Sequence, residues 1–325
     1  GRRTGVVMKP SPWDWQAAGP RRIEQAASLI RLDGPDTRRF LHGQTSAAID
    51  GCPAGSWIPT CCITATGRLR GLAEVLLDDA GAWLLISGGD PASIWQALDR
   101  VLFPADQVHL GPVMPARMVT PLGEGRPDQW PQSPAGRWLA LENGSPGWLL
   151  GEQLVIPADG ELPPWLADLP PLSPQDQERW RIQQGLADWP WEINDSTNPF
   201  ELGLADRVSL SKGCYVGQET LAKLSTYDGV KQQLRRWYGS SSEGTVGPAP
   251  GAPLFGLDDD SASRAGQITS ALALAGGLWI GLALVRRQFL ERNELRLGQE
   301  PYGPILQLSL PPAWVDPPAG AGRQV

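Results

Sequence analysis

The stretch Lys212-Gly213-Cys214-Tyr215-Val216-Gly217-Gln218-Glu219 carries the most information in this sequence. A glycine on each side of Cys214 lets the backbone turn tightly and leaves the sulfur uncrowded. The residues from Gln218 to Lys223 are typical of the first turns of a helix, so Cys214 precedes a helix N-terminus and lies near Lys212. Both features lower a thiol pKa toward the reactive thiolate. A buried, inert cysteine is the commoner outcome, and spacing alone favours it because no histidine lies nearby in the sequence to act as a base.

The same stretch lies in the most basic part of an acidic chain. The 325 residues carry a formal net charge of −7, yet residues 207–236 hold six cations and two acids, which leaves −11 for the remainder. The overall charge argues against a protein whose whole surface binds nucleic acid. The local excess of cations indicates a site for an anionic ligand, but an ordinary solvated face explains it equally well.

Cysteine and histidine are too scattered to form a metal site. The four cysteines and two histidines contain no CxxC pair and no metal-ligand spacing, so no metal is predicted. They also form no disulfide framework, which favours a reducing, cytoplasmic location. We expect Cys61 and Cys62 to fill the core, because adjacent side chains alternate faces in a strand. His42 and His109 are expected to be structural, and Cys52 is given no role.

One uncharged run has the composition of a membrane segment. Ile268 to Val285 spans 18 residues without a charge, whereas a spanning helix needs about 20. Gly276-Gly277 in its middle suits a two-residue hairpin turn, so we predict two buried strands and no membrane segment. Elsewhere strands are expected at 28–32, 72–77, 82–87, 138–142 and 148–150, and helices after Asp36, Asp90 and Ser173.

The octapeptide of residues 212–219 resembles the signature of the YgfZ family, the folate-binding relatives of the glycine-cleavage T-protein. The likeness extends over about residues 26–310 and is weakest in the middle. Further segments similar to the family pattern are Phe40–Thr45, Thr64–Arg68, Leu98–Phe103, Arg181–Gly185, Pro199–Leu204 and Arg264–Ser270.

The resemblance implies an α+β fold in which three T-protein-like lobes form a ring around a folate-sized pocket, with a β-barrel at the C-terminus. On this basis the chain divides into an N-terminal arm, a first α+β lobe, a second α+β lobe with the signature segment, a barrel and a disordered tail. The corresponding ranges are 1–25, 26–115, 116–239, 240–310 and 311–325.

The resemblance also implies tetrahydrofolate, or a derivative of it, as the cofactor, and a role in assembling or repairing iron–sulfur enzymes, including those that modify tRNA. The expected partners are folate and, transiently, iron–sulfur proteins or their assembly factors; we expect a monomer without direct DNA binding. Folate carries carboxylates and a flat pterin, so cations would hold the first and an apolar cleft the second. We expect Cys214 to be the reactive thiol, with Lys212 as its catalytic neighbour. The candidate folate-binding residues are Arg181, Glu201, Lys212, Tyr215, Gln218, Lys223 and Lys231.

Departures from the related patterns separate two functions. A T-protein would carry an acidic pair at Gly71 and Leu72 and an asparagine at Thr64; its acids help to activate the cofactor for aminomethyl transfer. Neither glycine nor leucine accepts a proton, so transfer by that mechanism lacks its general base here. A folate-dependent aminomethyl transferase is therefore the alternative function, and a module that only senses folate is a third. Within the YgfZ pattern, Gly203 replaces a usual asparagine and Gln232-Gln233 a common basic residue.

Overall fold

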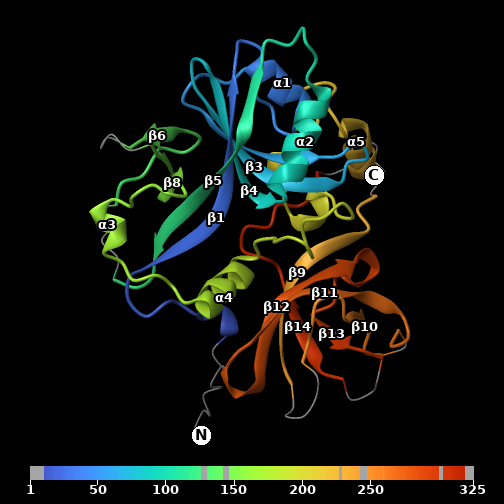
Figure 1. Ribbon diagram of the computed structural model, residues 1–325. Coiled ribbons are helices and arrows are strands. Elements are labelled where there is room, and N and C mark those ends of the chain that lie inside the picture. The colour runs from blue at the N-terminus through green and yellow to red at the C-terminus, as the bar shows by residue number, and fades with distance from the viewer. Residues whose placement is uncertain are drawn as a thin grey trace, which may run out of the picture.

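The computed structural model describes residues 11–125, 130–141, 146–226, 229–241, 247–258, 260–299 and 303–318. Within these residues the chain builds an eight-stranded antiparallel sheet and a closed six-stranded barrel, with few helices. The sheet lies above the barrel in Figure 1, and helix α4 (Pro174–Gln184) lies at their junction. The mixed α+β class and the C-terminal barrel predicted from the sequence are confirmed.

The sheet has the strand order β2-β3-β4-β1-β5-β8-β7-β6. The edge strands β2 and β6 lie close to each other at one end: backbone hydrogen bonds join residues 55–57 to residues 136–138. The sheet is therefore strongly curved, and its long central strand β5 runs from the first predicted α+β lobe into the second. The strands are β1 (Arg21–Asp33), β2 (Trp57–Ile63), β3 (Leu69–Leu77), β4 (Gly81–Gly89), β5 (His109–Leu122), β6 (Trp138–Ala140), β7 (Trp148–Leu150) and β8 (Gln153–Pro157).

Two helices pack beside this sheet, α1 (Thr37–Gln44) and α2 (Pro91–Val101) (Figure 1). Helix α2 begins where the sequence predicts, because the Asp90 carboxylate accepts a hydrogen bond from the backbone N–H of Ala92. Ile94 and Leu98 of α2 are buried in the same apolar core as Leu41 of α1. Helical spacing of apolar residues thus places both helices on the sheet.

The barrel closes in the order β10-β11-β12-β9-β14-β13 around the fully buried Trp237. Gly281 leaves room for that side chain, since a Cβ there would lie 2.2 Å from the indole ring. The uncharged run predicted to be two strands forms the β11–β12 hairpin, and Gly276 and Gly277 turn it at φ of 73° and 75°. The strands are β9 (Gln232–Ser240), β10 (Pro253–Phe255), β11 (Arg264–Ala273), β12 (Leu278–Arg286), β13 (Glu294–Leu297) and β14 (Ile305–Ser309). Over the ranges the structure describes, no helix has the length and apolar character to cross a membrane.

Helix α4 connects the sheet to the barrel. Ser173 caps its first turn as predicted, and Gly185 ends it at φ 71°. The Arg181 guanidinium donates hydrogen bonds to Glu192 at 3.1 Å and to Ser270 of β11 at 2.8 Å, which fixes α4 against the barrel. The shorter helical elements are η1 (Pro12–Asp14), α3 (Pro164–Ala167), η2 (Pro199–Leu202), η3 (Ala205–Arg207), α5 (Gln218–Thr226), η4 (Ala275–Gly277) and η5 (Arg287–Phe289).

The predicted segment limits do not all coincide with element boundaries. Strand β1 begins at Arg21, inside the arm predicted for 1–25, whose first ten residues lie outside the described residues. The limit at 115/116 falls within β5, and β9 enters the barrel ahead of residue 240. Strand β5 pairs with β1 on one side of the 115/116 limit and with β8 on the other, and β9 pairs with β12 and β14 of the barrel. No local sequence signal indicates these pairings.

The prediction of a disordered tail over 311–325 is wrong for residues 311–318. Val315 N–H donates to the carbonyl of Gly203 at 3.1 Å, and the Arg235 guanidinium lies 4.9 Å from the Trp314 ring centroid. The composition of the segment suggested disorder, but Trp314 packs against Arg235 and Gly203 and orders residues 311–318. Residues 319–325 lie outside the described residues.

Candidate functional site

The signature loop, residues 208–217, docks on the C-terminal end of α1, from which it is about 170 positions distant in sequence. Lys212 anchors it, because its Nζ donates to the backbone carbonyls of His42, Thr45 (2.7 Å) and Ala47. Carbonyls at a helix end lack intrahelical partners, so an ammonium satisfies them. Burial lowers the pKa of Lys212 to about 7, whereas the three acceptors occupy all three N–H groups of the ammonium and favour the charged form.

Backbone contacts complete this docking. Val216 N–H donates to the carbonyl of Gly43 at 3.0 Å, and His42 Nε2 lies 3.5 Å from the carbonyl oxygen of Lys212. Residues 40–45, which also resemble a family segment, therefore form one unit with the signature. In sequence no histidine lies near the cysteine loop; His42 comes close to it only in the folded chain.

Cys214 is exposed on this loop, as expected. Gly213 and Gly217 hold φ of 95° and 79°, a region that favours glycine. A Cβ on Gly217 would lie 2.6 Å from the carbonyl oxygen of Thr64, so that position also needs glycine for space. A Cβ on Gly213 would meet open space, so the surroundings of the thiol are uncrowded on that side.

The other cysteines differ from Cys214 in burial. Cys61 and Cys62 lie in β2, and burial raises the pKa of Cys61 to about 11 and that of Cys62 to about 12. Both are therefore protonated near neutral pH and chemically quiet, and their expected place in the core is confirmed. Cys52 is partly exposed. In the described ranges no group of three or more His, Cys, Asp or Glu side chains is arranged to hold a metal ion.

Three further candidate residues lie around α5. Tyr215 is buried in the core, donates its hydroxyl to the Ser209 carbonyl at 2.6 Å, and has its pKa raised to about 12 by burial. Gln218 begins α5, and Lys223 is exposed on it, with its Nζ 3.3 Å from Glu219. None of the three lines the cavity described next.

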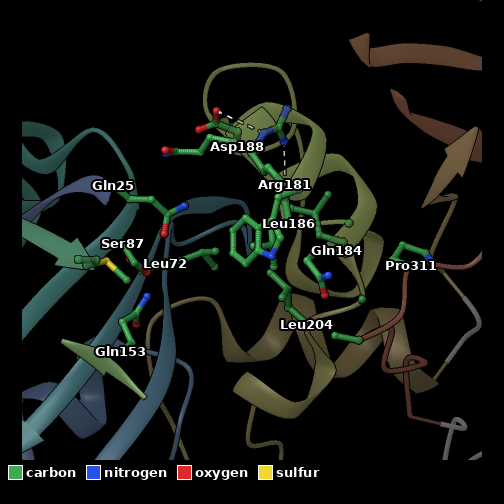
Figure 2. A pocket seen from close by; sticks show the side chains of 18 of the residues that line it. Gln25, Leu72, Ser87, Gln153, Arg181, Gln184, Leu186, Asp188, Leu204 and Pro311 are labelled. Atoms are coloured by element: carbon green, nitrogen blue, oxygen red, sulfur yellow. Dashed lines mark hydrogen bonds and ion pairs between the residues drawn. The ribbon is translucent and has the colours of Figure 1, made fainter. Parts of the chain in front are cut away.

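A cavity of about 520 Å³ lies between the sheet and α4. Gln25 of β1, Ser87 of β4 and Gln153 of β8 project into it from the sheet (Figure 2). Gln184 and Leu186, at the end of α4, face them from the other side (Figure 2). This central cavity has the size of pockets that hold drug-sized ligands.

Every charged side chain that lines the central cavity forms an ion pair. Each carboxylate has an arginine nitrogen within 4.0 Å, which offsets part of its charge. The two arginines of the wall, Arg181 and Arg207, are likewise engaged by protein carboxylates. The pairs are Glu24–Arg117 (2.9 Å), Glu74–Arg207 (3.2 Å), Glu178–Arg181 and Asp188–Arg181 (3.9 Å).

Neutral amides provide the free hydrogen-bonding groups of this cavity. Within the described ranges the side chains of Gln25 and Gln184 have no hydrogen-bond partner, whereas Gln153 donates to Thr120 at 3.3 Å. Apolar side chains, among them Leu72 and Leu186, complete the wall. The cavity therefore suits a neutral ligand that carries several donors and acceptors. Sequence reasoning missed the glutamines, because they stand in no motif and come from separate strands and a helix.

The ordered tail closes another side of the central cavity through Pro311 and Trp314. Gly203 has φ 74°, and a Cβ on it would lie 2.3 Å from the Trp314 ring. Glycine at position 203, where the family resemblance leads one to expect asparagine, therefore gives Trp314 its place. This departure is explained by the packing of the tail.

The remaining candidates do not gather in one place. Arg181 lines the central cavity, whereas Glu201 and Lys231 line a separate hollow. The cations of the basic segment 207–236 are equally dispersed, so it does not form a single patch. Arg207 is ion-paired with Glu74, Lys212 binds carbonyls, Lys223 lies on α5, Lys231 lies at the hollow, and Arg235 and Arg236 stack on Trp314 and Trp13.

Comparisons of sequence identify two relatives, although no protein-family model matches the chain. It is 30% identical over 227 residues to a chloroplastic protein of Arabidopsis thaliana that carries the name "Putative transferase", covering 63% of this chain and 52% of that protein. It is 32% identical over 110 residues to the tRNA-modifying protein YgfZ of Photobacterium profundum, covering 34% of this chain and 32% of that protein. The chain thus spans about half the length of the first relative and a third of the second.

Comparison of structures identifies the fold. The crystal structure of the glycine cleavage system aminomethyltransferase T from Bartonella henselae matches with a TM-score of 0.72 at 14% identity. The match covers 95% of this chain and 90% of that one, so the two share the arrangement of sheet and barrel. The chain is therefore similar to YgfZ over about a third of its length and has the fold of the glycine-cleavage aminomethyltransferase.

Proposed function

We propose that this protein binds tetrahydrofolate, or a derivative of it, in the central cavity and supports the assembly or repair of iron–sulfur enzymes, including those that modify tRNA. The observation that carries the folate half is the unpartnered pair of amides, Gln25 and Gln184, which face each other across a cavity of about 520 Å³ whose wall mixes polar and apolar side chains. A pterin ring presents several donors and acceptors at its edge, and amides match such an edge without adding charge.

The charges that line the central cavity also predict the orientation of bound folate. Arg181 and Arg207 are held by protein carboxylates, so they do not offer the glutamate tail of folate a free cation. Burying that tail against Glu24, Glu74 and their neighbours would cost free energy. We therefore expect the ring inside the cavity and the carboxylates toward solvent.

The same cavity argues against the alternative function, an aminomethyl transferase of the T-protein type. Leu72 contributes an aliphatic side chain to the wall at a position where that mechanism needs an acid. Gly71 is buried so tightly that a Cβ would lie 2.5 Å from the Gly88 carbonyl oxygen, which leaves no space for a carboxylate. The likeness to a named transferase keeps this alternative open to experiment.

The second half of the proposal concerns Cys214. Its exposure and its placement by Lys212, Gly213 and Gly217 make it available to a partner macromolecule. We infer that this thiol acts on a transient iron–sulfur partner in the cytoplasm, at a surface apart from the central cavity.

Calorimetric titration with tetrahydrofolate under anaerobic conditions tests the folate half. We expect one site per chain, and an affinity about tenfold weaker in each of Gln25→Met and Gln184→Met, because one hydrogen bond to an otherwise buried group contributes about 1.4 kcal/mol. Gln132→Met, at an exposed glutamine outside the cavity, is the matched control and should leave the affinity unchanged. Equal affinity in all three variants would place the ligand elsewhere. Turnover of an aminomethyl donor by the purified protein would favour the transferase.

A further inference from the structure

A second hollow, which we name the basic hollow, lies on the other side of η2 from the central cavity. Its volume is about 520 Å³, and its walls come from the β2–β3 turn, residues 196–201, the start of β9 and the end of β12. Glu201 of η2 faces this hollow, whereas the next residue, Leu202, lines the central cavity. Adjacent residues of η2 thus line the two spaces.

Four cations surround the basic hollow. Arg68, Lys231, Arg286 and Arg287 are all exposed, and Glu201 is the one carboxylate in the wall. Across the ranges the structure describes, Arg68, Lys231 and Arg286 have no carboxylate oxygen within 4.0 Å, in contrast to the paired arginines of the central cavity. A net positive hollow on a chain with net charge −7 is a local attractor for anions.

These cations stand on ordered backbone. Arg68 donates to the carbonyl of Ser196 at 2.8 Å, and Arg287 N–H donates to the carbonyl of Lys231 at 2.9 Å. Arg286 stands on β12 directly opposite Gln232 of β9. The cations that line the hollow therefore come from the paired strands β9 and β12, the residues next to them and the tight β2–β3 turn.

We propose that the basic hollow binds a small oligoanion, a ligand with two or more phosphate or carboxylate groups. Guanidinium groups bind such oxyanions through paired N–H donors, and three of the four cations are arginines. A hollow of this volume accommodates a few anionic groups, and the acidic remainder of the surface repels a long polyanion. The proposal does not depend on folate in the central cavity.

Calorimetry with inorganic tripolyphosphate and with tri-γ-glutamate tests the proposal and distinguishes phosphate from carboxylate ligands. We expect at least one of these probes to bind with a stoichiometry of one, and the affinity to fall about tenfold or more in the double variant Lys231→Gln/Arg286→Gln. The matched control, Arg100→Gln/Arg264→Gln, removes two exposed arginines from other elements and should bind as the wild type does.

Three results would overturn the proposal. They are no binding of either probe at low salt, an equal loss of affinity in the control variant, and tight binding of a 20-nucleotide RNA by a protein that binds neither small probe. All four substituted residues are exposed, so the variants should fold, and circular dichroism checks that they do.

Discussion

Replacing Lys212 by methionine tests whether this residue holds the signature loop against α1. The ammonium group donates to the carbonyl of His42 in α1 and to those of Thr45 and Ala47, which follow the helix. A hydrogen bond to a charged group contributes about 1.5–3 kcal/mol net, and contributions from one ammonium to three acceptors do not add in full. Burial lowers the Lys212 pKa to about 7, and removing the charge also removes the free-energy cost of burying it. We therefore expect the free energy of unfolding to fall by about 2–4 kcal/mol.

Urea unfolding followed by tryptophan fluorescence measures this change. Lys223→Met is the matched control, because Lys223 is exposed and, among the residues that the structure describes, pairs only with Glu219 on the same helix, an interaction of about 0.5 kcal/mol or less. Limited proteolysis gives a second readout: Lys212→Met should be cut within residues 208–217 before the wild type is. The reasoning fails if the two lysine variants are equally stable and equally resistant to cleavage.

Three further predictions concern the thiols, the tail and the role in the cell. Iodoacetamide at pH 8 should modify Cys214 first and spare Cys61 and Cys62, whose pKa values of about 11 and about 12 leave little thiolate, until the protein unfolds; early labelling of either in the folded protein, seen by mass spectrometry, would contradict this. Gly203→Asn should lower the free energy of unfolding by about 1–3 kcal/mol because the new Cβ meets Trp314, and it should cost less than about 1 kcal/mol in a Trp314→Ala background; equal costs would show that the ring does not explain the glycine. In a strain that lacks the protein, iron–sulfur enzyme activity should fall and be restored by Cys52→Ala but not by Cys214→Ala; full restoration by Cys214→Ala would remove the thiol from the mechanism, and normal activity in the strain would favour a folate sensor.

Local structure could be read from the sequence wherever the cause is local. Asp90 and Ser173 cap helices, and Gly276-Gly277 turns a hairpin, as predicted. Each of these features depends on a few consecutive residues whose backbone preferences are strong. The signature octapeptide indicated the fold because it resembles a known family, not because its spacing determines one.

The arrangement of the candidate site could not be read in the same way. Lys212 binds partners about 170 positions away in sequence. The cations of the basic segment 207–236 are dispersed because they belong to η3, the signature loop, α5, and β9 with the residue before it. Gln25 and Gln184 look like ordinary polar positions in sequence, and only the packing of β1 against the end of α4 makes them cavity groups. Trp314 orders the tail through contacts with Gly203 and Arg235, which local composition does not encode.

A crystal structure of the protein with tetrahydrofolate tests the central proposal most directly. We predict density for the pterin ring inside the central cavity, with its edge within hydrogen-bonding distance of the Gln25 and Gln184 amides and its glutamate tail toward solvent. Density for the ring in the basic hollow or beside Cys214, with the central cavity filled only by water, would contradict it.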